Sequence, residues 1–484
     1  MKKQTFSQYF KLGKSQYELD FVDVPINDGD IPLFIDPYAI AKRTNRWSIQ
    51  CNNLIVTFFQ KAVDHIRNGQ YSKAQYMFSG LREPNQTRFG LSTGKVPRGR
   101  GIGGDQAIEL YNALKDSSAV QTGFLRDLED CELLIEGISR DKISDMTTNI
   151  IRAKLIEYTQ SQCNLFGIET HQVPSGLIWD DHNEKWISIY TELPICHSKS
   201  VILIPKATAR FDTEYNHQEY YQHFVLNFLQ AEHLSANSSL VRVLKDGTKK
   251  EPTKKSLKEK YPLSKQYLYE FSKEHPDVLS RYKKSKASDL RELTDEIILE
   301  MTEQPPQPNY NQLATELANI SPGDADATRF HNHMKGVLTA IFYPSLVNPV
   351  KEQEIHDGRK RIDLVYENSA RSGFFFSLPQ IKNIPSAYIM IECKNYSADP
   401  KNPELDQLAG RFSVNRGRFG FLICRTLANK KLFYQRCKDT ASDDRGFIIP
   451  LDDKDVRILL GFKRNNDFMA IDKFLDERFR MLVM

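Results

Sequence analysis

The stretch YIMIECKNY, residues 388–396, constrains the fold more than any other part of this 484-residue chain. Its first four residues are largely apolar, as in a core strand, and the run then reaches Glu392 and Lys394. Alternate residues of a strand point to the same face, so the carboxylate and the ammonium group share one side. The stretch therefore predicts a buried strand that ends in a charged pair.

The segments around this strand predict an ordered series of elements. Residues 325–343 carry apolar side chains at helical spacing, and Pro344 ends that helix. The dipeptide Asp357-Gly358 lies between two strand-like runs and predicts a hairpin. Residues 403–412 predict a helix, and residues 419–424 (FGFLIC) predict a fourth strand. The predicted order is helix, strand, strand, strand, helix, strand.

The predicted hairpin indicates which carboxylates lie on the same face of the sheet. If Asp357-Gly358 is a two-residue turn, Glu354 faces Arg361 and Glu352 faces Asp363. Directly opposed residues of an antiparallel pair point to the same side. Asp363, Glu352 and Glu354 then share one face, although a change of one residue in the turn removes this arrangement.

The motifs Arg361-Ile362-Asp363 and Ile391-Glu392-Cys393-Lys394, in this order of elements, resemble those of the PD-(D/E)XK nuclease superfamily. The resemblance covers roughly residues 325–425 and implies a restriction-endonuclease-like αβββαβ core. Gln407 adds to it, since several branches of the superfamily carry a glutamine in the following helix. Two positions depart from the pattern: Ile362 replaces proline, and the first helix has His331, Asn332 and His333 where an acid is expected. Either Glu354 replaces that acid or the metal site is reduced.

The resemblance implies catalysis of phosphodiester hydrolysis by a metal-activated water. Two carboxylates hold a hard divalent cation by oxygen, which suits Mg²⁺ or Mn²⁺. The expected ligands are Asp363, Glu392, the backbone carbonyl of Cys393, and Glu354. Lys394 is expected to orient the attacking water or stabilise the transition state, with Gln407 beside it. A structural alternative is that Glu392 and Lys394 form an ion pair that closes a core strand, with Asp363 as an edge residue.

Cationic side chains near this face are expected to contact the nucleic-acid backbone. Arginines interleave with aromatic residues in RFSVNRGRFGF, which suits phosphate contact and base stacking. The alternative is a solvated surface over core phenylalanines. The expected nucleic-acid contacts are Arg359, Arg361, Arg411, Arg416 and Arg418, with Arg425 nearby.

Length and segment character predict a multidomain protein of the α/β and α+β classes. Residues 1–240 predict a mainly helical mixed α/β region for sensing or assembly, with a long helical run over 143–166 and two strands within 185–205. Residues 241–320 predict a basic helical connector with a proline-rich linker at 303–309. Residues 321–484 are the expected nuclease domain.

The seven cysteines form no C-x-x-C pair, which argues against a zinc site or a disulfide framework, and no apolar run reaches membrane-spanning length. A cytoplasmic protein without a membrane partner is expected. We therefore predict a metal-dependent DNA endonuclease, a bacterial restriction or antiphage-defence effector that acts on duplex DNA as a homo-oligomer or with a companion defence protein. The alternatives are an RNase and a non-catalytic nucleic-acid-binding or scaffold protein with a degenerate nuclease fold.

Overall fold

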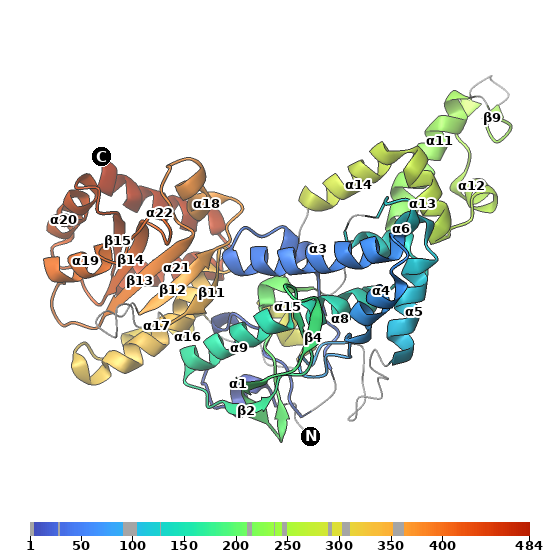
Figure 1. Ribbon diagram of the computed structural model, residues 1–484. Helices are drawn as coiled ribbons and strands as arrows, with labels where there is room; N and C mark the ends of the chain where they lie inside the picture. The colour runs from blue at the N-terminus through green and yellow to red at the C-terminus, as the bar shows by residue number, and fades with distance from the viewer. Residues whose placement is uncertain are drawn as a thin grey trace.

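The computed structural model describes residues 4–27, 30–90, 104–125, 127–210, 215–236, 238–243, 249–288, 293–302, 310–351 and 363–484. The predicted turn at Asp357-Gly358 and the predicted linker 303–309 lie outside these residues. Figure 1 shows a C-terminal unit built on one sheet and a larger, mainly helical N-terminal part. The protein is therefore of the mixed α/β class, as the sequence predicts.

Helices make up most of the N-terminal part. The 22-residue α3 (Arg46–Arg67) buries Cys51, Ile55 and Phe58, whose spacing of three and four residues forms one apolar stripe. The other helices before the C-terminal unit are α1 (Phe6–Tyr9), α2 (Pro37–Ala41), α4 (Tyr71–Ser79), α5 (Gly104–Lys115), α6 (Ser118–Gln121), α7 (Asp130–Leu134), α8 (Arg140–Ile150), α9 (Arg152–Phe166), α10 (His217–Tyr220), α11 (Leu226–Ser235), α12 (Lys254–Lys260), α13 (Lys265–Glu274), α14 (Pro276–Ser288) and α15 (Asp295–Met301).

Short two-stranded ribbons connect these helices. They pair β1 (Phe34–Ile35) with β8 (Ala209–Arg210), β2 (His171–Pro174) with β5 (Tyr190–Leu193), β3 (Ile178–Asp180) with β4 (Lys185–Ile187), β6 (Ile195–Cys196) with β7 (Lys199–Ser200), and β9 (Arg242–Val243) with β10 (Lys249–Lys250). The two strands predicted within 185–205 are therefore four short ones, because turns interrupt the run. The predicted helical run 143–166 is divided between α8 and α9 at Ile151.

The C-terminal unit contains a five-stranded sheet. Its strands lie in chain order: β11 (Leu346–Val350), β12 (Leu364–Asn368), β13 (Tyr388–Lys394), β14 (Phe419–Cys424) and β15 (Phe447–Leu451). β12 is antiparallel to both of its neighbours, β11 and β13, and β14 and β15 run parallel to β13. The helices are α16 (Tyr310–Ala318), α17 (Ala327–Phe342), α18 (Gly373–Gln380), α19 (Asn402–Ala409), α20 (Lys430–Ser442), α21 (Asp453–Arg464) and α22 (Phe468–Val483). The predicted order of elements corresponds to α17, β11, β12, β13, α19 and β14, with α18 added between β12 and β13.

Alternation along β14 separates the two faces of this sheet. Phe419 and Phe421 point to one face, where Phe421 stacks on Phe342 of α17 with ring centroids 5.4 Å apart. Glu392 is paired in register with Leu422, so both side chains point to the opposite face. The acidic end of β13 is therefore directed away from α17 and toward α19.

The N-terminal part is attached to the β11–β12 edge of this sheet. Glu367 of β12 accepts hydrogen bonds from Asn45 Nδ2 (2.8 Å) and the Trp47 backbone N–H (3.1 Å) at the start of α3. Arg43 Nη1 donates to Ser369 Oγ at 2.9 Å. These contacts explain why the N-terminal end of α3 lies against the C-terminal unit in Figure 1. Buried apolar residues form one large core in each of the two parts.

None of the described helices combines sufficient length with sufficient apolar character to cross a bilayer. The seven cysteines, all within the described residues, are buried free thiols.

Candidate active site

The site is formed where β12 begins and β13 ends. Leu364 pairs with Ile391, so Asp363, which directly precedes β12, lies beside Glu392 and Cys393. The Cys393 backbone N–H donates to Asp363 Oδ2 at 2.7 Å. Antiparallel pairing therefore brings together two carboxylates that are 29 positions apart in the sequence.

Glu392, Lys394 and Gln407 form a connected group. Lys394 Nζ donates to Glu392 Oε1 at 2.7 Å, as expected for residues two apart on one face of a strand. Gln407, on α19, donates from Nε2 to the same Glu392 oxygen at 2.9 Å, and its own Oε1 lies 3.4 Å from Lys394 Nζ. The side chain of Glu392 is 2% exposed and that of Lys394 is 15% exposed. The structure thus brings Glu392, Lys394 and Gln407 together.

The electrostatics of the group are dominated by burial. Burial and the nearby charge of Asp363 raise the pKa of Glu392 to about 7, although Lys394 and Arg411 oppose this shift. Burial lowers the pKa of Lys394, but its ion pair with Glu392 outweighs that effect, so the pKa lies above its ordinary value. Glu392 Oε2 is buried and has no hydrogen-bond partner in the described structure. One buried oxygen of this ionisable carboxyl group therefore has no hydrogen bond in the described structure to offset the cost of its burial.

His331 of α17 lies where the resemblance implies an acidic residue and the sequence has none. Its Nε2 lies 2.8 Å from the Cys393 carbonyl oxygen, and its Nδ1 lies 3.9 Å from Asp363 Oδ1. His333 points elsewhere, with its Nε2 3.0 Å from the Leu313 carbonyl oxygen. Two residues of a helix separated by one position do not share a face, which predicts that at most one of these histidines reaches the site. The sequence did not indicate which one.

Of the five arginines predicted to contact nucleic acid, three lie within the described residues. Arg359 and Arg361, like the predicted ligand Glu354, lie outside the described residues. Arg411 is 2% exposed and lies close enough to Glu392 to influence its pKa. Arg411 is therefore a buried cationic neighbour of Glu392.

Arg416 and Arg418 lie at the opposite end of the sheet. The Tyr388 backbone N–H, at the start of β13, donates to the Arg416 carbonyl oxygen at 2.9 Å. Lys394 is six residues further along the strand, a distance of about 20 Å. Arg418 pairs with Asp444 at 2.9 Å. These two arginines are near each other in the sequence and in space, but the structure does not bring them to the carboxylates.

Arg425 is a buried structural residue. It is 6% exposed, and its Nε pairs with Asp453 at 2.9 Å. Its Nη1 donates to the Ile320 carbonyl oxygen (2.6 Å) and to Asn395 Oδ1 (2.9 Å). The guanidinium group is thus buried and bonded to the protein itself.

The described residues contain no group of three or more His, Cys, Asp or Glu side chains arranged to hold a metal ion. Two of the expected ligands, Asp363 and Glu392, are adjacent, and the Cys393 carbonyl lies between them and His331. The arrangement provides two carboxylates, one carbonyl and one ammonium group at a single edge of the sheet.

Comparison with known proteins gives one match. Residues 11–216 match the model of a family described as a domain of unknown function, DUF8370. No curated protein and no solved structure shows significant similarity to the chain. The match covers much of the N-terminal part and does not include the candidate site.

Proposed function

We propose that this protein is a metal-dependent DNA endonuclease whose C-terminal unit belongs to the PD-(D/E)XK class. The observation that supports this proposal most is the convergence of Asp363, Glu392, Lys394 and Gln407 at one edge of a mixed sheet. These are the four residues that the sequence motif singles out. The order of strands and helices around them agrees with the αβββαβ arrangement that the resemblance implies.

The chemistry of the carboxyl groups fits a divalent cation. Asp363 is close enough to raise the pKa of Glu392, and Glu392 Oε2 has no hydrogen-bond partner in the described structure. Oxygen ligands and adjacent negative charges suit Mg²⁺ or Mn²⁺. Asp363, Glu392 and the Cys393 carbonyl would hold the ion, with Glu354 as a further expected ligand outside the described residues. When bound, the ion supplies a Lewis acid that acidifies water and offsets phosphate charge.

The remaining residues have separable tasks. Lys394 keeps its proton, because its pKa is raised, and we assign it an electrostatic role: it orients the attacking water and stabilises the charge that develops on the phosphate. Gln407 bridges Glu392 and Lys394 and so fixes both side chains. The buried Arg411 adds positive charge behind Glu392. Such preorganised charges stabilise a transition state without reorganisation cost at the moment of reaction.

A non-catalytic nucleic-acid-binding protein is the second candidate, and one observation favours it. His331 Nε2 is within hydrogen-bond distance of the Cys393 carbonyl that is expected to bind the metal. That carbonyl oxygen has two lone pairs, so a histidine donor leaves one available. We therefore favour the catalytic function, with duplex DNA as substrate and RNA as the alternative. A role in restriction or antiphage defence, with a homo-oligomer or a companion protein, rests on the large N-terminal part and on analogy of layout.

The test is a cleavage assay with purified full-length protein. Supercoiled plasmid, linear duplex, single-stranded DNA and RNA are incubated with Mg²⁺, Mn²⁺ or EDTA, beside Asp363→Ala and Lys394→Ala. We expect metal-dependent cleavage of duplex DNA that falls on the order of 10³-fold in both variants. Cleavage that persists in both variants, or in EDTA, would overturn the assignment, and cleavage of RNA alone would replace the proposed substrate.

A further inference from the structure

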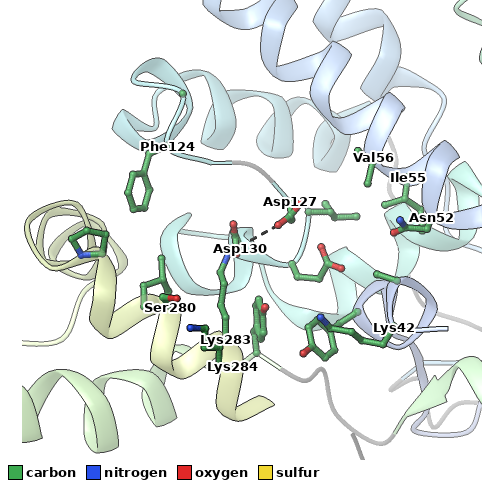
Figure 2. A pocket seen from close by; sticks show the side chains of 18 of the residues that line it. Lys42, Asn52, Ile55, Val56, Phe124, Asp127, Asp130, Ser280, Lys283 and Lys284 are labelled. Atoms are coloured by element: carbon green, nitrogen blue, oxygen red, sulfur yellow. Dashed lines mark ion pairs between the residues drawn. The ribbon is translucent and has the colours of Figure 1, made fainter. Parts of the chain in front are cut away.

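A cavity of about 770 Å³ lies in the N-terminal part, away from the candidate active site. It is bounded by the end of α2, by α3, by residues 122–124 and 127–130, and by α13 and α14 (Figure 2). This volume is in the range of pockets that enclose small molecules. The proposed nuclease chemistry makes no use of it.

One wall of the cavity is acidic. Asp130 is 3% exposed and pairs with Lys283 at 2.5 Å, and Lys283 also lies 4.0 Å from Asp127. Burial and the charges of Asp127 and Asp130 raise the pKa of Glu129 to about 8. Figure 2 shows Lys283 extending from α14 toward Asp130 and Asp127. Asp127 and Asp130 thus share Lys283, and Glu129 lies near both of them, which leaves acceptor oxygens for N–H donors of a ligand.

The rim of the cavity has the opposite charge. Lys42, Lys273 and Lys284 line it and are exposed to solvent. Thr122 and Ser280 also line the cavity. Exposed lysines of this kind bind phosphate or carboxylate groups as flexible point charges.

The remaining lining is apolar and partly aromatic. Ile55 and Val56 of α3 contribute aliphatic surface, and Phe124 contributes a ring from the opposite side (Figure 2). A planar heterocycle gains from such contacts. The cavity therefore combines an acceptor-rich wall, apolar sides and a cationic rim.

The combination excludes the simplest ligands. An anion alone is repelled by Asp127 and Asp130, and a polyamine is repelled by the lysines at the rim. A ligand that fits must present N–H donors at one end and negative charge at the other, with a flat apolar part between them. We propose that this cavity binds a nucleotide, with the base edge at Asp127 and Glu129 and the phosphates at Lys42, Lys273 and Lys284.

The position of the cavity connects it to the rest of the protein. Lys42 contributes to its rim, and the Lys42 carbonyl oxygen accepts a hydrogen bond from Arg371 Nη2 of the C-terminal unit at 3.3 Å. The next residue, Arg43, bonds Ser369 at the end of β12. A nucleotide held by Lys42 would therefore touch a residue that is itself bonded to the C-terminal unit.

The test is calorimetric titration of the full-length protein in EDTA, so that neither cleavage nor a bound divalent cation contributes. The probes are ATP, GTP, adenosine, guanosine and sodium tripolyphosphate. The variants are the double substitution of Lys273→Ala with Lys284→Ala, and Glu129→Gln. Lys258→Ala changes an exposed lysine of α12 outside the cavity and serves as the matched control.

We expect one molecule of ATP or GTP to bind, and the double lysine variant to weaken its Kd by about tenfold. Glu129→Gln should change the ratio of the ATP and GTP affinities, because that side chain faces the base edge. Absence of ATP and GTP binding at millimolar concentration overturns the proposal, as does equal weakening by Lys258→Ala. Tripolyphosphate that binds as tightly as ATP and GTP also overturns it, since the base would then contribute nothing. Each of these results is independent of whether the protein cleaves DNA.

Discussion

Glu392→Gln is expected to abolish cleavage and, at the same time, to stabilise the folded protein above pH 7. The Glu392 side chain is 2% exposed, and its pKa is raised from 4.5 to about 7. The folded protein therefore holds this proton more tightly than the unfolded chain does. The free energy of unfolding falls as pH rises from about 4.5 to about 7, and the loss, about 3 kcal/mol, is complete at higher pH. Glutamine carries no charge and escapes this loss.

The assay is thermal unfolding by calorimetry at pH 5 and pH 8, in EDTA. For a unit of this size, about 3 kcal/mol corresponds to a rise of about 6–12 °C in the Tm of its transition. We expect this rise for Glu392→Gln at pH 8 and little change at pH 5. Glu477→Gln, at an exposed position of α22, removes the same charge without burial and should leave the Tm unchanged at both pH values.

The same experiment separates the two interpretations of the Glu392–Lys394 pair. If the pair only closes a core strand, its removal leaves Lys394 without its partner and lowers the Tm at pH 8. A Tm for Glu392→Gln that is equal to or below that of the unchanged protein at pH 8 would therefore refute the reasoning. A stabilising substitution that also removes activity would mark Glu392 as a functional group kept at the expense of stability.

Three further predictions follow from the described contacts. His331→Asp places a third carboxylate near Asp363 and should tighten Mn²⁺ binding by on the order of tenfold in calorimetry; unchanged or weaker binding would contradict a cation site at this position. Arg425→Met removes the buried partner of Asp453 and should destabilise the C-terminal unit by about 3–5 kcal/mol in urea denaturation, so a stability close to that of the unchanged protein would argue against the structural role. Burial raises the pKa of Asp20 to about 6, despite hydrogen bonds from Tyr158 and the Asn348 backbone, so about 3 kcal/mol of stability is lost between pH 4 and pH 6. In urea denaturation, Asp20→Asn should reduce the difference between the free energies of unfolding at pH 4.5 and pH 7.5. An unchanged difference would refute this prediction.

Local sequence patterns predicted much of the C-terminal unit. Residues 387–393 and 419–424 are short apolar runs bounded by polar or glycine-rich segments, and they are β13 and β14. The helix predicted over 325–343 is α17, because its apolar stripe forms the face that packs on the sheet. The resemblance implied that Asp363 lies near Glu392, and the antiparallel pairing of β12 with β13 brings the two residues together.

Long-range contacts account for what the sequence did not show. The start of α18 is held by Asp472 of α22, whose Oδ1 accepts from the Phe374 backbone N–H at 2.8 Å, and no local signal at residues 372–380 indicates this cap. Arg425 resembles a surface cation in the sequence, but Asp453 and carbonyl groups of α16 and the residues after it surround it. Arg416 and Arg418 precede β14, and strand direction places them at the far end of the sheet. In each case the decisive partner is distant in the sequence.

The most direct test of the central claim is a calorimetric Mn²⁺ titration of the full-length protein and of Asp363→Ala, with Glu477→Gln as the control. We predict that the unchanged protein and the control bind Mn²⁺ and that Asp363→Ala loses this binding, because Asp363 and Glu392 are the adjacent carboxylates of the site. An absence of Mn²⁺ binding, or equal binding in Asp363→Ala, would contradict a metal-dependent nuclease and leave the charged end of β13 with a structural role alone.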